Sequence, residues 1–229
     1  MKYVVITGGS KGIGQALVRI FNKNGYKVLS LDIEEPVSKI PGVTYKILDI
    51  RDSDAVRKFT ETSLGIDILI NNAAVQYVNP LKKLKDEQIK AMLDTNIYGT
   101  LNITKAYIPY LKNGLIVNVG SVHSEVPRTE KIPYDMSKAA LSIFTKEIAL
   151  ELSEQNTRAI CVEFGAVKTP MNNNFENEEK RKEALSKQVI NHLMTGEECA
   201  EVIYDLTTEK YQYMNGQTLK YDCGRSIKN

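Results

Sequence analysis

The chain has 229 residues, of which 42% are hydrophobic and 25% charged, a balance typical of a globular protein with a sizeable core. Thirty basic and 28 acidic residues leave a net charge of +2, which indicates neither a nucleic acid nor an anionic membrane as partner. Three widely spaced cysteines, two histidines and no apolar run of membrane-spanning length predict a cytoplasmic protein without disulfides or a metal site.

Short apolar runs alternate with helical patterns along the chain. Strands are predicted at 3–7, 27–32, 45–50, 67–73, 115–120, 159–164 and 217–222. Helices are predicted at 12–23, 53–62, 86–112, 134–153 and 196–207. Because alternating strands and helices form right-handed βαβ units, the pattern predicts an α/β fold, with a doubly wound parallel sheet in a single domain spanning 1–229.

Two segments depart from this rhythm. Only twelve residues separate Asp32 from Tyr45, and they include Pro36 and Pro41, so any helix there has at most a turn or two. The segment 171–192 is strongly polar and charged. We interpret it as a helical excursion near the mouth of a substrate pocket, with an ordinary solvated surface helix as the alternative.

A glycine-rich loop follows the first predicted strand. The run VVITGGSKGIG places Gly8, Gly12 and Gly14 between that strand and a helix. Such a tight turn lets the backbone approach a pyrophosphate, while the helix N-terminus supplies partial positive charge. Ser10, Lys11 and Ile13 of the same loop complete the candidate phosphate-binding set. A glycine-rich turn without a ligand is the alternative.

Asp32 ends the second predicted strand, eighteen residues after Gly14. At that position a carboxylate can accept hydrogen bonds from both ribose hydroxyls of an adenosine, and it would repel a 2′-phosphate. Lys11 argues the other way, because its ammonium can neutralise such a phosphate. Asp32 has the more fixed position, so the sequence favours NAD over NADP.

The next two predicted strands end in further candidate contacts. Asp49, followed by Ile50, can accept from the adenine amino group or instead cap the following helix, a task that Asp52 or Ser53 can also perform. After the fourth strand, the run NNAA at 71–74 offers the small residues Ala73 and Ala74, which let the backbone lie close to a cofactor. Its asparagines, Asn71 and Asn72, can tie neighbouring strands together.

A candidate proton-transfer group lies further along. Tyr134 and Lys138 are one helical turn apart, and the ammonium would favour the phenolate of a tyrosine whose pKa is ordinarily about 10. Ser121, at the end of the fifth strand, can donate to a carbonyl oxygen that becomes an alkoxide. Asn96 can hold a water that links Lys138 to solvent. Each pattern alone is weak, since each residue can equally be an ordinary surface or turn residue; the combination favours catalysis.

This combination resembles the classical short-chain dehydrogenase/reductase family over essentially the whole chain. The matching pieces are TGGSKGIG (7–14), DI (49–50), NNAA (71–74), Asn96, Ser121, YDMSK (134–138) and VKT (167–169). The resemblance implies a Rossmann-type domain with a seven-stranded parallel sheet flanked by helices on both faces, and a homo-oligomer, tetramer or dimer. It also implies an Asn-Ser-Tyr-Lys tetrad, Asn96, Ser121, Tyr134 and Lys138, with Val167 and Thr169 at the nicotinamide.

The sequence departs from the family pattern at four places. Ala74 replaces a glycine, Phe164 stands where proline is common, and Cys223 replaces a glycine near the end. The helix expected after the second strand is cut short. None of these changes removes a member of the tetrad.

These features predict an NAD-dependent oxidoreductase, with NADP less favoured, that interconverts an alcohol and a ketone or aldehyde using Tyr134 as general acid/base. A non-catalytic NAD(H)-binding sensor is one alternative, and an enoyl reductase, whose Tyr-to-Lys spacing in the related branch is longer, is another. The substrate is a small molecule. Its pocket is predicted to be lined by the segment 171–192, by Tyr77 and by five residues after the serine, Val122, His123, Ser124, Val126 and Pro127. The sequence leaves open whether that substrate is a sugar, a steroid, a hydroxy acid or an acyl thioester.

Overall fold

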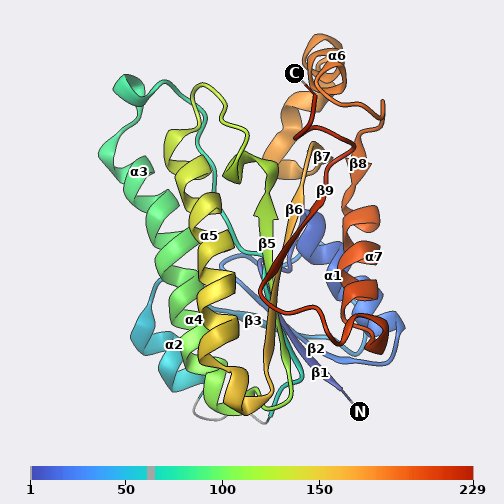
Figure 1. Ribbon diagram of the computed structural model, residues 1–229. Helices are drawn as coiled ribbons and strands as arrows, with labels where there is room; N and C mark the ends of the chain where they lie inside the picture. Colours follow the sequence, from blue (N-terminus) through green and yellow to red (C-terminus); the bar gives the residue numbers. More distant parts are fainter. Residues whose placement is uncertain (1, 61–64, 229) are drawn as a thin grey trace.

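A seven-stranded parallel sheet forms the centre of the molecule (Figure 1). The computed structural model describes residues 2–60 and 65–228. The sheet has the order β3-β2-β1-β4-β5-β6-β9, and every neighbouring pair is parallel. Its strands are β1 (Tyr3–Thr7), β2 (Lys27–Asp32), β3 (Thr44–Ile47), β4 (Ile68–Asn71), β5 (Leu115–Ser121), β6 (Arg158–Phe164) and β9 (Gln217–Tyr221).

The sheet is covered by helices on both faces because its central strands are apolar on both sides. Val4 and Ile6 of β1 belong to the core that packs against α1 (Gly12–Lys23) and α7 (Gly196–Leu206), whereas Val5 belongs to the opposite core. Successive side chains of a strand point to opposite faces, so a run of Val and Ile buries both. The Rossmann-type, seven-stranded architecture predicted from the sequence is confirmed.

The second face is covered by the helices on the left of Figure 1. These are α2 (Ser53–Thr60), α3 (Asp86–Leu93), α4 (Thr100–Tyr107) and α5 (Ile132–Glu151). The predicted helix 86–112 is not uniform: a π-helical turn, Asp94–Gly99, separates α3 from α4, and a 3-10 turn, Ile108–Tyr110, follows α4. The predicted helix 53–62 is described only to residue 60. No helix forms in the described residues between β2 and β3.

The polar segment after β6 does contain a helix, as predicted. A short strand, β7 (Val167–Lys168), pairs with β8 (Met194–Thr195) in a separate two-stranded sheet. Between them lie a 3-10 segment, Pro170–Glu176, and α6 (Glu178–Ser186), which stands at the top of Figure 1 beside the C-terminal end. The remaining short 3-10 helices are Leu81–Lys83, Val122–Ser124, Ser153–Gln155 and Glu209–Tyr211.

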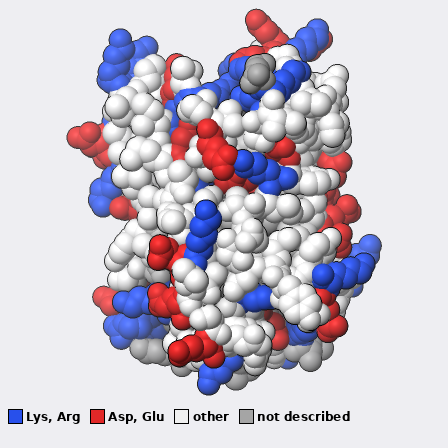
Figure 2. Space-filling model, viewed as in Figure 1, with Lys and Arg blue, Asp and Glu red and all other residues white. Residues whose placement is uncertain are grey.

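The surface carries charges of both signs. Figure 2 shows basic and acidic side chains interspersed over one face, as the net charge of +2 leads one to expect. Cys161, Cys199 and Cys223 are free thiols. Within the described residues, no helix has the length and apolarity needed to cross a bilayer. That 1–229 form a single domain stays a prediction.

Candidate active site

A cavity of about 590 Å³ lies at the carboxyl ends of the central strands. Its walls come from the residues that follow β1, β2, β3, β4 and β5, together with α5 and the loop after β6. The chain winds outward in opposite directions from β1 and β4, the neighbouring strands where the sheet order reverses. In open parallel sheets a ligand binds above such a switch point, so the fold itself places the candidate site here.

The glycine loop has the geometry that a pyrophosphate requires. Gly8 and Gly12 adopt left-handed backbone conformations, with φ of +69° and +58°. A Cβ atom on Gly14 would lie 1.9 Å from the Gly8 carbonyl oxygen, and one on Gly8 would lie 2.8 Å from the Cα of Ala73. Any side chain at these positions would therefore distort the loop. The loop leads directly into α1, and its residues fit the diphosphate of a dinucleotide.

Two carboxylates stand together beside this loop. Asp32 accepts hydrogen bonds from the main-chain N–H groups of Ser10 (2.9 Å) and Glu34 (3.2 Å). Glu34 forms an ion pair with Lys11, with 2.8 Å between Oε2 and Nζ. The Lys11 ammonium, which the sequence presents as a possible phosphate ligand, is therefore already paired.

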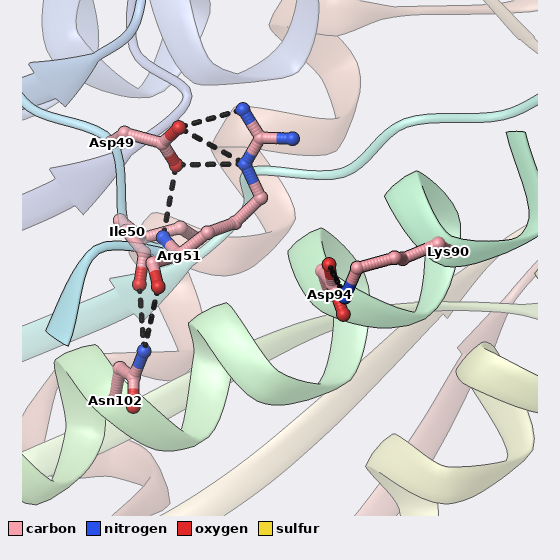
Figure 3. Close-up of polar contacts among 6 residues, drawn as sticks. All are labelled: Asp49, Ile50, Arg51, Lys90, Asp94 and Asn102. Atoms are coloured by element: carbon pink, nitrogen blue, oxygen red, sulfur yellow. Dashed lines mark hydrogen bonds and ion pairs between the residues drawn. The ribbon is translucent and has the colours of Figure 1, made fainter. Parts of the chain in front are cut away.

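Asp49 is held by its neighbour two residues along the chain. Its carboxylate accepts three hydrogen bonds of 2.6–3.0 Å from the Arg51 guanidinium and another from the Arg51 N–H (Figure 3). The guanidinium holds the pKa of Asp49 below its usual range. Asp52 accepts from the Ala55 N–H and caps α2. Asp49 therefore does not cap α2. Its carboxylate is paired with Arg51 and borders the predicted adenine end of the cavity.

The end of β4 is fixed to both neighbouring strands. Asn71 donates to Asn118 on β5 (2.8 Å) and to Thr104 on α4 (3.0 Å). Asn72 donates to the carbonyl oxygens of Thr7 and Gly8, both at 3.0 Å. Both asparagines therefore tie the strands together and hold the floor of the cavity, where Ala73 and Ala74 follow.

Ser121, Tyr134 and Lys138 meet in the same cavity. The Ser121 hydroxyl lies near enough to the Tyr134 phenol to lower its pKa. The Lys138 ammonium lies 5.8 Å from the centre of the Tyr134 ring and donates to the Val119 carbonyl oxygen at 2.7 Å. Helical spacing on α5 and the carboxyl end of β5 thus bring together three groups that are far apart in sequence.

The pKa of the Tyr134 phenol differs from the value that the sequence predicts. Burial raises the pKa of Tyr134 to about 12, although the nearby Ser121 hydroxyl acts in the opposite direction. Burial also lowers the pKa of Lys138 to about 8. The prediction that Lys138 lowers the pKa of Tyr134 is wrong for the protein alone: desolvation is the largest cause of the shift, and Lys138, whose ammonium donates to the Val119 carbonyl, is not among the groups that shift it.

Asn96 occupies the π-helical turn between α3 and α4, where it is fully buried. Its side-chain oxygen accepts from the Val75 N–H (2.8 Å), and its amide donates to the Val75 carbonyl (3.0 Å) and the Ser137 hydroxyl (3.0 Å). The side chain is committed to these bonds, which join the loop after β4 to the helix that carries Tyr134. Its predicted water would have to use the main-chain carbonyl, to which Thr100 already donates (3.0 Å).

Most of the predicted site residues line this cavity. They are Gly8, Lys11, Gly12, Ile13, Asp32, Asp49, Ile50, Asn72, Ala73, Ala74, Ser121, Tyr134, Lys138, Val167 and Thr169. Ser10, Gly14 and Asn96 lie behind the wall: Ser10 bonds to Asp32 and Glu34, and Gly14 packs on Gly8. Tyr77 also lines the cavity, as predicted.

A second cavity of about 470 Å³ adjoins the first through Ser121 and Tyr134. Part of the predicted substrate pocket lies here, because the cavity is lined by Val122, His123, Asn172, Phe175, Lys180, Glu183, Ala184 and Lys187. Ser124, Val126 and Pro127 do not line it. The sequence analysis missed Gln76 and Lys131, although Lys131 lies three residues before Tyr134, a spacing that places both on one helical face.

The chain was compared with known proteins. A family model described as short chain dehydrogenase matches residues 2–180. A 3-oxoacyl-(acyl-carrier-protein) reductase, FabG of Thermotoga maritima, is 32% identical over 242 residues, covering 99% of this chain and 98% of that protein. The glucose 1-dehydrogenase of Gluconobacter oxydans is 29% identical over 246 residues, which cover 99% of this chain and 92% of that protein. The solved 4-hydroxyisoleucine dehydrogenase complexed with NADH superposes with a TM-score of 0.94 and 25% identity, covering all of both chains.

The chain therefore belongs to the short-chain dehydrogenase family. It is an oxidoreductase of that family with a nicotinamide cofactor. None of these comparisons supports the alternative of a non-catalytic sensor.

Proposed function

We propose that this protein interconverts an alcohol and a ketone or aldehyde, with NAD(H) as the preferred cofactor. The observation that carries the proposal is the meeting of Ser121, Tyr134 and Lys138 in one cavity with the glycine loop. When bound, the nicotinamide supplies the acceptor or donor of a hydride. Side chains of the protein orient the substrate, transfer the proton and supply positive charge.

The side chains divide that work as follows. Ser121 donates to the substrate oxygen and orients it toward Tyr134, whose phenol lies beside the serine hydroxyl in the same cavity. Tyr134 takes the hydroxyl proton during oxidation and returns it during reduction. Lys138, still mainly protonated at pH 7 with a pKa of about 8, supplies the positive charge at this end of the cavity. A phenol whose pKa burial raises to about 12 needs that charge, and that of an oxidised nicotinamide, to act as a base.

Two carboxylates support NAD over NADP. Asp32 borders the cavity and would accept from the ribose hydroxyls, and Glu34 pairs with the one lysine of the glycine loop, Lys11. A 2′-phosphate bound here would meet Asp32 and a Lys11 that is already paired. Coulomb repulsion between two like charges about 4 Å apart costs about 1 kcal/mol or more. A repulsion of that size is enough to make NAD bind several-fold more tightly than NADP.

The test is an absorbance assay of the purified protein with a panel of secondary alcohols and ketones, each with NAD(H) and NADP(H). We expect turnover of at least one pair, with a higher kcat/KM for NAD(H). Tight binding of NADH with no turnover across the panel would instead favour the sensor.

A homo-oligomer remains part of the proposal. The two helices α4 and α5 carry exposed apolar side chains, including Leu101 (42% exposed), Ile143 (55%) and Leu150 (74%). Exposed apolar surface on long helices is typical of subunit interfaces. Light scattering after size exclusion should therefore show a mass of at least two chains.

A further inference from the structure

The second cavity is lined by an excess of positive charge. Five basic side chains face it, against the two acidic side chains Glu130 and Glu183; the basic ones are Arg128, Lys131, Lys180, Lys187 and Arg225. The outer face in Figure 2 shows no such excess, since both signs are mixed there. The cavity therefore differs in charge from that face, and it opens directly onto Ser121 and Tyr134.

Lys131 is a buried basic residue of this cavity that lacks an acidic partner within the part of the chain that the structure describes. It is only 7% exposed, and its ammonium donates to the side-chain oxygen of Gln76 at 2.9 Å and lies 5.5 Å from the centre of the Tyr134 ring. Among the described residues, no carboxylate lies within ion-pair distance of it. A buried cation held by one neutral acceptor is costly unless a ligand supplies the missing negative charge.

Two nearby carboxylates have other partners, although the Oδ1 atom of Asp135 accepts no hydrogen bond. Glu183 pairs with Lys187 and lies 3.7 Å from the Arg128 guanidinium. Asp135 accepts from the Arg128 N–H at 3.1 Å and lies 3.9 Å from the His123 ring. His123 is neutral, because burial and the charge of Lys131 lower its pKa to about 4. The local charge around Lys131 thus stays positive.

From this geometry we propose that the substrate is a short hydroxy acid or keto acid whose carboxylate binds Lys131 and Gln76 while its hydroxyl or carbonyl oxygen meets Ser121 and Tyr134. This inference rests on the proposed function and adds the substrate class to it. A carboxylate suits the site because it accepts from the Lys131 ammonium and the Gln76 amide N–H at once. The closeness of Lys131 to the Tyr134 ring limits the carbon chain between the two functional groups to a few atoms.

The reaction leaves the carboxylate unchanged. Oxidation breaks the carbinol C–H and O–H bonds; the hydride goes to the oxidised nicotinamide and the proton goes to Tyr134. A keto acid, a reduced nicotinamide and a proton are the products. Reduction is the exact reverse.

The first test compares 2-, 3- and 4-hydroxy acids of four or five carbons with their methyl esters, using the cofactor that the protein prefers. We expect kcat/KM for at least one acid to exceed that of its ester by at least tenfold. In Lys131→Met this acid-to-ester ratio should fall at least tenfold, to about one, mainly through a higher KM for the acid, as for a lost hydrogen bond to a charged group. Lys182→Met, an exposed lysine of α6 paired with Glu178, is the matched control and should keep the ratio.

A second test needs no turnover. Butanoate and butanamide are titrated into the protein–NADH complex in a calorimeter, and the acid should bind at least tenfold more tightly. The difference should vanish in Lys131→Met, whose melting temperature should rise because a buried, unpaired charge is gone. Gln76→Glu should also block butanoate, since its own carboxylate would occupy Lys131.

The outcomes separate the two proposals. If some alcohols are oxidised but esters match their acids, and Lys131→Met leaves the ratio intact, the carboxylate site is refuted while the proposed function stands. A higher kcat/KM for glycerol 3-phosphate than for every hydroxy acid would also overturn it, in favour of a phosphate. If no alcohol is oxidised at all, the proposed function fails, and equal binding of butanoate and butanamide would then refute the carboxylate site independently.

Discussion

The Lys138 ammonium donates a 2.7 Å hydrogen bond to the main-chain carbonyl oxygen of Val119. This bond fixes the lysine of α5 to the carboxyl end of β5, two residues before Ser121. The ammonium is buried, and burial lowers its pKa to about 8. Its place in the site is thus set by the strand rather than by the phenol one turn away.

Replacing Lys138 by methionine keeps the aliphatic stem and removes the charge. We expect kcat to fall about 100-fold or more, because proton transfer by Tyr134 loses its nearby cation. The KM for the cofactor should rise as well. Lys146→Met, an exposed lysine two turns further along α5, is the control. A Lys138→Met variant with kcat within threefold of the wild type would show that the ammonium has no role.

Asn96 should act as a positioning residue. Asn96→Ala leaves both main-chain groups of Val75 without their side-chain partner, at a cost of roughly 1–3 kcal/mol in the free energy of unfolding. Because Asn96 also bonds Ser137 on the helix of Tyr134, kcat should fall by about tenfold or more. Urea unfolding and steady-state kinetics measure the two effects. Asn96→Asp keeps the acceptor for the Val75 N–H and should recover part of the stability; an Asn96→Ala protein as stable as the wild type contradicts this role.

Cofactor choice should depend on Glu34. Glu34→Gln breaks the ion pair with Lys11 and removes one negative charge beside Asp32, so the ratio of kcat/KM for NADP to that for NAD should rise about fivefold to tenfold. Glu35→Gln is the matched control, since Glu35 pairs with Lys39 instead. An unchanged ratio in Glu34→Gln would mean that Lys11 does not reach the 2′ position.

His123 should make the protein sensitive to mild acid. Burial lowers its pKa from 6.5 to about 4 in the folded state, so the folded protein binds fewer protons than the unfolded chain across that window. The free energy of unfolding should therefore fall by roughly 3 kcal/mol on this account as the pH drops from 6.5 to 4. His123→Gln should flatten that part of the curve in urea titrations. Parallel curves for the two proteins would show that His123 titrates normally.

The fold was predictable because its signals are local. Runs of Val and Ile such as 3–7 and 115–120 mark buried parallel strands, and the helical patterns between them set the topology. The π-helical turn at Asp94–Gly99 was not predictable, because the residues there continue an ordinary helical pattern. What distinguishes the turn is its packing, including the close approach of Gly99 to Ile50.

The candidate site was predictable where a residue's position in an element fixes its place. Asp32, Ser121 and Tyr134 reach the cavity because they stand at strand ends or on the inner face of α5. The raised pKa of Tyr134 was not predictable, since it depends on burial by several segments. The contact of Lys131 with Gln76 joins residues 55 positions apart and likewise requires the folded chain.

The most direct test of this account is the substitution Tyr134→Phe, which removes one oxygen atom from the cavity. Alcohol oxidation is followed by NADH absorbance, and NADH binding is measured separately by calorimetry. Turnover should fall at least 1000-fold while the dissociation constant for NADH changes less than threefold, since the phenol transfers the proton and contributes little to holding the dinucleotide. Turnover within tenfold of the wild type would mean that another group moves the proton, and the catalytic role of Tyr134 would have to be abandoned.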